Sequence, residues 1–328
     1  MTASQPIEPS DLQSAIAALR RDYPNLAPRI RKLEHNVTCA SAAVSIRLHY
    51  PSFRQGAATV SDLIEVIVHY LVHFALPRAE VAKVMELYGK IDAEEFRVKL
   101  SQLAQSAISL FKRANEATNR NGEAGELILY LMTEWILEAP QIIAKMSLKT
   151  NPQMPVHGAD GVHVRYKPET STLMLYWGES KLYADVGAAI DSAVKSISEA
   201  LDPGMIKHEL ELVGRNIDFS GLAEKARVEM LRHLDPFDEA SNQRHNVSTC
   251  LIGFDFEGFQ KIVGLDGDAA EAKFCELAQE KLSALAEKLT NSLQGAGLGN
   301  QPIELFFFPV PSVQELRDLF QAKIGWKT

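Results

Sequence analysis

Thr172-Leu-Met-Leu-Tyr-Trp-Gly178 is a short apolar run, and the tripeptide Glu179-Ser180-Lys181 follows it directly. The run is rich in residues that favour extended chain, so we predict a β-strand that the tripeptide closes. Alternate residues of a strand share a face, so Glu179 and Lys181 point to the same side as Trp177. A carboxylate and an ammonium that continue an apolar face are costly unless they are paired or bound to a metal ion.

Two further carboxylates lie upstream of this strand. Asp160 stands in the loop Gly158-Ala-Asp160-Gly161, just before a predicted strand at 162–166 that a turn joins to the Glu179 strand. Asp160 and Glu179 can therefore meet at a common strand end. Glu126 falls in the first turn of an apolar helix that begins at Gly122, and we expect it to join them. Glu123, one turn earlier, is either a favourable charge at a helix N-terminus or a supporting residue of the same site.

Three carboxylates at one place repel each other strongly unless a cation lies between them. Oxygen ligands without a cysteine or histidine cluster suit a hard ion, so we expect Mg²⁺ or Mn²⁺. Such a site suits phosphodiester hydrolysis. Asp160, Glu179 and the backbone carbonyl of Ser180 would bind the ion, and Glu126 would hold a metal-bound water or a second ion.

The remaining residues of the expected site are basic. Lys181 would hold or activate the attacking water and offset negative charge in the transition state. Lys145, Lys149 and His157 are candidate phosphate contacts, because they lie on the approach to Asp160. A second Glu-x-Lys, Glu271-Ala-Lys273, lies in a predicted helix with no acidic partner placed before it, and we interpret that copy as surface charge.

Composition limits the class of protein. The chain has 328 residues, of which 46% are hydrophobic and 23% charged, as in ordinary globular proteins. It has no apolar run of about 18 residues and no secretion signal at its start, so we expect neither a membrane span nor export. The cysteines Cys39, Cys250 and Cys275 are three in number and far apart, which favours the reducing cytoplasm over a disulfide framework or a zinc site.

The formal net charge of −8 argues against a free-standing protein that coats nucleic-acid phosphates. It does not exclude a nuclease, because metal-binding carboxylates contribute to the total. Affinity for DNA would then come from a local patch or from a partner, so we expect a subunit of a larger assembly.

Strands interleaved with helices predict an α/β fold with a mixed central sheet flanked by helices. Residues 1–118 read as a mostly helical region, which either packs on the core or forms a separate domain. The core spans 119–328, with a helical insertion at about 203–245. Helices are predicted at 61–76, 78–88, 93–118, 122–138, 185–201, 268–293 and 312–323. Strands are predicted within 37–50 and at 141–148, 162–166, 172–181, 247–255 and 303–309.

The order of Glu126, Asp160 and Glu179-x-Lys181 resembles the PD-(D/E)xK nuclease superfamily, with Ala159 in place of the motif proline. More closely, the segments 122–126, 145–163 and 177–183, with Phe306-Phe-Phe-Pro309, resemble the nuclease subunit of Hachiman antiphage defence systems, the HamA family. The resemblance implies a restriction-endonuclease-like core and a bacterial effector nuclease that degrades DNA broadly. It also implies a superfamily 2 helicase subunit, HamB-like, that restrains the nuclease until it senses damaged or invading DNA.

Three functions are compatible with these features of the sequence. The first is the Mg²⁺-dependent DNA nuclease subunit, motivated by the ordered carboxylates and Lys181. The second is a non-catalytic scaffold with a nuclease-like fold that binds a helicase or DNA. The third is a stand-alone restriction or repair endonuclease that cuts without any partner.

Overall fold

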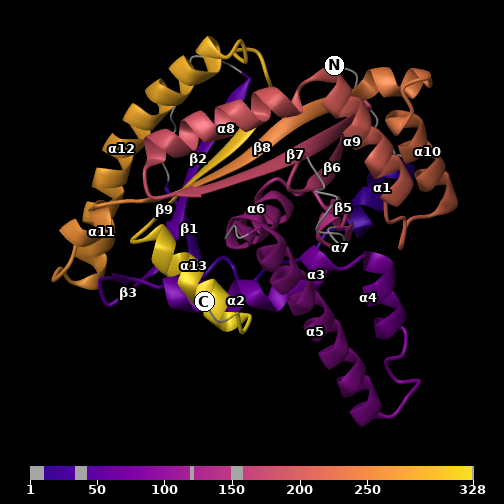
Figure 1. The fold of residues 1–328 in the computed structure, drawn as a ribbon, viewed down its shortest axis with the longest axis horizontal. Coiled ribbons are helices and arrows are strands. Elements are labelled where there is room, and N and C mark those ends of the chain that lie inside the picture. Colours follow the sequence, from indigo (N-terminus) through magenta and orange to yellow (C-terminus); the bar gives the residue numbers. More distant parts are fainter. Residues whose placement is uncertain (1–10, 34–42, 119–121, 149–157, 327–328) are drawn as a thin grey trace, which may run out of the picture.

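The computed structural model describes residues 11–33, 43–118, 122–148 and 158–326. A seven-stranded sheet crosses the molecule in the order β1-β2-β9-β8-β7-β6-β5 (Figure 1). Strands β2, β9, β8 and β7 are parallel, whereas β1, β6 and β5 run antiparallel to their neighbours. The strands are β1 (Ile30–Lys32), β2 (Val44–Pro51), β5 (Gln141–Ile143), β6 (Val162–Lys167), β7 (Thr172–Tyr183), β8 (Arg244–Asp255) and β9 (Ile303–Val310). The predicted mixed sheet is confirmed.

One face of the sheet is covered by two helical groups. Against β2, β8 and β9 pack α8, α11 and α12, and against β5, β6 and β7 pack α1, α9 and α10. These helices are α1 (Asp11–Ala18), α8 (Val186–Ala200), α9 (Pro203–Asn216), α10 (Glu224–Leu234), α11 (Gly258–Lys261) and α12 (Gly267–Gly295), and a 3₁₀ turn, η2 (Glu239–Gln243), precedes β8. The region 203–245 is thus mostly helical, as predicted, and it closes over the β6–β7 end of the sheet.

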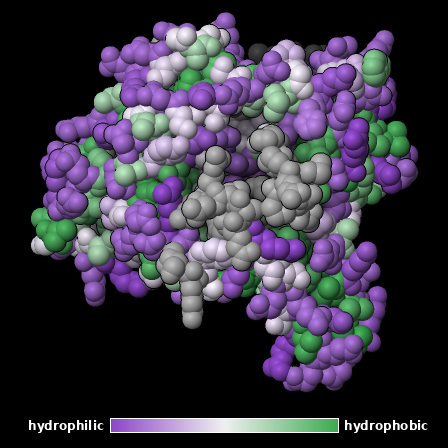
Figure 2. Space-filling view, in the orientation of Figure 1, coloured by the Kyte–Doolittle hydropathy of each residue, from purple (hydrophilic) through white to green (hydrophobic). Residues whose placement is uncertain are grey.

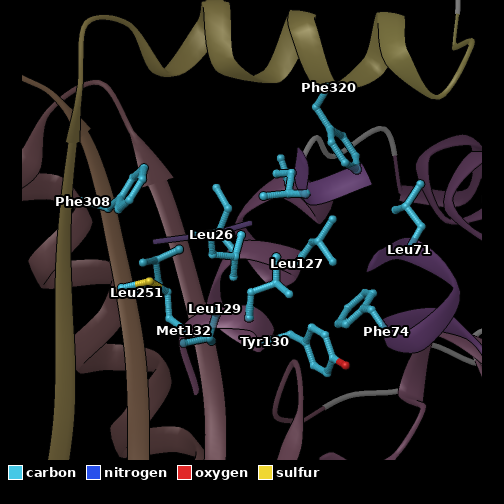
Figure 3. Close-up of a cluster of buried hydrophobic side chains, with 14 of the residues drawn as sticks. Leu26, Leu71, Phe74, Leu127, Leu129, Tyr130, Met132, Leu251, Phe308 and Phe320 are labelled. Atoms are coloured by element: carbon cyan, nitrogen blue, oxygen red, sulfur yellow. The ribbon is translucent and has the colours of Figure 1, made fainter. Parts of the chain in front are cut away.

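The opposite face is covered by a second helical layer around α6. Figure 3 shows Leu127, Leu129 and Met132 of α6 between Leu251 and Phe308 of the sheet and Phe320 of α13. The helices of this layer are α2 (Val60–Ile67), α3 (Leu71–Ala75), α5 (Ala93–Thr118), α6 (Glu123–Ile136), α7 (Lys145–Leu148) and α13 (Val313–Lys323), and the 3₁₀ turn η1 (Val68–Tyr70) joins α2 to α3. Helix α6 is apolar nearly all round, which explains why it is enclosed.

Helices α4 (Arg78–Met85) and α5 project from this layer (Figure 1). The projection carries exposed apolar side chains at Met85, Tyr88 and Val98, and Figure 2 shows hydrophobic and hydrophilic residues mixed there. Among the described residues no single helix could cross a membrane by length and apolar character. The segments Val60–Ala75 and Arg78–Met85 pass that test only as a pair, bent by 102°.

Three local predictions are corrected. The predicted strand 141–148 is the short strand β5 followed by the helical turn α7, with a register shift in β5 where it pairs with β6. The predicted helix 61–76 begins one residue earlier and is broken into α2, η1 and α3. Strand β1 was not predicted, and the small ribbon of β3 (Phe53–Arg54) and β4 (Ala57–Ala58) was also missed.

The described part of residues 1–118 shares the sheet and the core with the rest of the chain. Strand β2 pairs in parallel with β9, with Val44 opposite Ile303. Helices α2, α3 and α5 enclose the same apolar cluster as α6 and α13. Of the predicted strand at 37–50, the part before residue 43 lies outside the described residues.

Candidate active site at the end of strands β6 and β7

A β-bulge places Asp160 beside the end of β7. The Asp160 amide donates to the Gly178 carbonyl at 2.7 Å, and the Gly178 amide donates to the Gly161 carbonyl at 2.9 Å. Two residues on one strand therefore face one on the other, an arrangement that turns a side chain away from its regular direction. A Cβ atom on Gly178 would lie 3.2 Å from the Gly161 nitrogen, so the close approach depends on glycine.

The Asp160 carboxylate is fixed to the Glu-Ser-Lys tripeptide. Its Oδ2 accepts a hydrogen bond from the Ser180 amide at 2.8 Å. The N–H and C=O of one strand residue point to the same edge, so the Ser180 carbonyl also faces the Asp160 side. The predicted meeting of Asp160 with the tripeptide is confirmed, and the Ser180 carbonyl has the direction expected of a ligand.

Glu179 and Lys181 lie on one face of β7, as the strand phase predicts. The Lys181 Nζ is 2.5 Å from the Glu179 Oε1, and the two side chains are 18% and 20% exposed. Glu179 also accepts a hydrogen bond from the hydroxyl of Ser196 on α8. The pairing and the partial burial show how the fold tolerates two charges at the end of an apolar face.

The charges at this strand end are unbalanced. Burial raises the pKa of Glu179, and the negative charge of Asp160 raises it further, while Lys181 and Ser196 offset only part of the rise. Burial alone would lower the pKa of Lys181, yet the neighbouring Glu179 holds it above its ordinary value. Two carboxylates whose charges repel, beside one carbonyl oxygen, fit a Mg²⁺ ion, which usually keeps several water ligands.

The third expected carboxylate, Glu126, lies in the first turn of α6. Helix α6 packs on the other face of β7, where a Cβ atom on Gly125 would lie 3.1 Å from the Ser180 Oγ. Within the described ranges, no group of three or more His, Cys, Asp or Glu side chains could hold a metal ion. The expected cluster of three carboxylates is therefore not found in the described part of the chain, and the role of Glu126 in the site stays a prediction. Glu123 is buried, 5% exposed, on the same helical turn.

Lys145 is buried inside the protein, so it does not make the expected contact with a phosphate. Its side chain is 2% exposed, and the Nζ donates to the Ala159 carbonyl at 2.8 Å and to Glu209 Oε2 at 2.5 Å. The error follows from the strand predicted here, because the helical turn α7 directs Lys145 inward. The other two candidates, Lys149 and His157, lie outside the described residues.

The second Glu-x-Lys is part of a different surface. Lys273 pairs with Glu276 on the same helix at 2.9 Å, and Glu271 accepts from the Tyr50 hydroxyl at 3.1 Å. Ser196, by contrast, was missed by the sequence reasoning. The spacing of Ser192 and Ser196, four residues apart beside the apolar face of α8, would have indicated a polar stripe toward β7.

Comparisons with known proteins agree with the resemblance found in the sequence. No curated protein matches the chain. The family model HamA matches residues 29–324, which include the sheet, all the helices named above except α1, and the site at the end of β6 and β7. The match covers far more than half of the chain, and the protein belongs to the HamA family.

Proposed function

We propose that this protein is a metal-dependent DNA nuclease, the effector subunit of a bacterial Hachiman antiphage defence system, controlled by a partner helicase. The observation that carries the proposal is the meeting of Asp160, Glu179 and Lys181 at one strand end. The family match supports membership of a Hachiman system. The order of these residues, as in the PD-(D/E)xK superfamily, supports phosphodiester hydrolysis.

Each side chain has a role that follows from its position. Asp160 is held by the Ser180 amide, and Glu179 by Ser196 and Lys181, so both carboxylates are oriented before an ion arrives. A bound Mg²⁺ or Mn²⁺ would polarise the phosphoryl group and lower the pKa of a water ligand. Lys181 remains an ammonium beside Glu179, which suits it to position the attacking water and to offset negative charge in the transition state.

A helicase partner would explain how so acidic a chain can act on DNA. A formal net charge of −8 disfavours binding to DNA phosphates unless a partner supplies basic surface. The sequence contains no GxxxxGK[ST] phosphate loop, so ATP hydrolysis in the assembly belongs to the other subunit. The partner would bring DNA to the site and restrain the nuclease until it is triggered.

The test compares cleavage of plasmid and single-stranded DNA by the wild type and by Lys181→Ala, with and without the partner helicase. Both proteins are assayed with Mg²⁺, with Mn²⁺ and with a chelator. Lys273→Ala is the matched control, because it removes the lysine of the other Glu-x-Lys. We expect Lys181→Ala to lower the cleavage rate by about a hundredfold or more, as for other charge-stabilising groups, and Lys273→Ala to cut like the wild type.

Two outcomes favour the alternatives. If no condition gives metal-dependent cleavage, while Glu179→Ala still binds the helicase or DNA normally, the protein is a scaffold with a nuclease-like fold. If the isolated wild type cuts specific sequences or structures and the helicase changes nothing, it is a stand-alone endonuclease.

A further inference from the structure

We propose that Lys145 and Glu209 form an internal brace that positions Asp160 for metal binding; the inference rests on the proposed nuclease function. Lys145 begins α7 and Glu209 lies in α9, so the brace joins two elements on either side of the Asp160 loop. Both are positioning residues that act through the backbone of the loop.

The first link runs from Lys145 to the residue before Asp160. The Lys145 Nζ donates to the Ala159 carbonyl at 2.8 Å. The peptide group of Ala159 is bonded to Asp160, whose own amide and Oδ2 are hydrogen-bonded to Gly178 and Ser180. The loop is therefore held from both sides, by β7 on one side and by the ammonium of Lys145 on the other.

The second link runs from Lys145 to the helical segment 203–245. Glu209 Oε2 is 2.5 Å from the Lys145 Nζ, and the side chains are 6% and 2% exposed. Two charges so deeply buried lose much hydration, and an apolar pair would often be as stable or more stable. Stability alone therefore does not explain why an ion pair stands here, and the geometry points to positioning.

The third observation is the fit of the loop against Glu209. A Cβ atom on Gly158 would lie 1.9 Å from the Glu209 Oε1, and Gly158 has a φ of +115°, which side chains rarely allow. Among the described residues, Glu209 Oε1 has no hydrogen-bond partner although it is buried. The backbone thus passes directly over the carboxylate, and a glycine two residues before Asp160 makes this contact possible.

The test measures Mn²⁺ binding by isothermal titration calorimetry on the full chain without DNA, beside thermal melting and DNA cleavage. The variant Glu209→Gln keeps the shape of the side chain and removes its charge. Glu211→Gln is the matched control, because Glu211 lies on the same helix in a surface pair with Arg215. We expect Glu209→Gln to weaken Mn²⁺ binding about tenfold or more, as loss of groups that orient metal ligands does elsewhere.

Saturating Mn²⁺ should restore the cleavage rate of Glu209→Gln, whereas Glu211→Gln should bind and cut like the wild type. If Glu209→Gln melts early, the double variant Lys145→Met/Glu209→Leu keeps the interior filled while removing the donor to Ala159. We expect this variant to fold and to bind Mn²⁺ weakly. Unchanged Mn²⁺ affinity in a folded brace variant would overturn the inference and leave the proposed nuclease intact. A wild type that neither binds Mn²⁺ nor cuts DNA would instead overturn the proposed function.

Discussion

Acid should destabilise the fold through His163, which lies on β6 with its ring against Tyr130 of α6. Its side chain is 1% exposed, and the Nδ1 donates to the Ala139 carbonyl at 2.9 Å. Burial lowers the pKa of His163 to about 4, and the partial opposition from Glu134 does not reverse the shift. The folded protein therefore holds this imidazole neutral at pH values where an unfolded chain would protonate it.

The sign and size of the effect follow from proton linkage. Between the unfolded pKa of about 6.5 and the folded value of about 4, the unfolded state binds more protons, so the free energy of unfolding falls as the pH falls. The maximum slope is about 1.4 kcal/mol per pH unit for one histidine, or about 3 kcal/mol over the window. The pKa of His49 is lowered in the same way, to about 3, and that of His73 to about 4, so the wild type should be steeper still.

Urea denaturation of wild type, His163→Gln and the exposed control His69→Gln, at intervals from pH 4.5 to 7.5, measures these slopes. Replacing His163 costs packing and a hydrogen bond at every pH, but only the proteins that keep His163 also have to exclude a proton from this position. Below pH 6.5 we expect the unfolding free energy of His163→Gln to depend less steeply on pH than that of the wild type. The difference should correspond to one proton, about 1.4 kcal/mol per pH unit, and His69→Gln should follow the wild type. Identical slopes for all three proteins would refute the reasoning.

Three further substitutions test the packing around the site by chemical denaturation. Glu134→Ala should cost about 3–5 kcal/mol, because it leaves the half-buried guanidinium groups of Arg21 and Arg78 without their buried carboxylate; a loss under 1 kcal/mol would contradict this. Leu251→Ala, at the sheet face of the α6 layer, should cost about 2–5 kcal/mol, whereas the 79% exposed Val263→Ala should change stability little. Asp202→Ala removes the cap that accepts from two amides of α9 and should cost about 1 kcal/mol, and equal stability would show that α9 does not depend on it.

The periodic parts of the chain were predicted well because their patterns are local. Helix α5 has the predicted bounds, Ala93–Thr118, and β7 continues through Lys181 as the phase of its apolar residues requires. The pairing of Asp160 with the tripeptide also followed, since two consecutive strands joined by a turn bring their ends together.

The face of β7 that the helix α6 covers could not be predicted from the sequence. A strand pattern fixes which residues share a face, but both faces of β7 are buried and either could receive the helix. The helix packs on the face where Gly125 fits against Ser180 and Leu182, a contact between residues more than 50 positions apart. The inward direction of Lys145 likewise depends on Glu209, which belongs to a distant helix.

The pairing of β2 with β9 has a consequence for biosynthesis. Among the described strands, β1 and β2 join the rest of the sheet through β9, so Val44 must pair with Ile303, 259 residues later in the chain. A ribosome adding about 5–20 residues per second would expose the edge of β2 for tens of seconds before its partner emerges. During that interval β2, whose Val44, Leu48 and Tyr50 are buried in the finished fold, has no neighbour on one side. The nascent chain should therefore depend on chaperones more than the finished protein does.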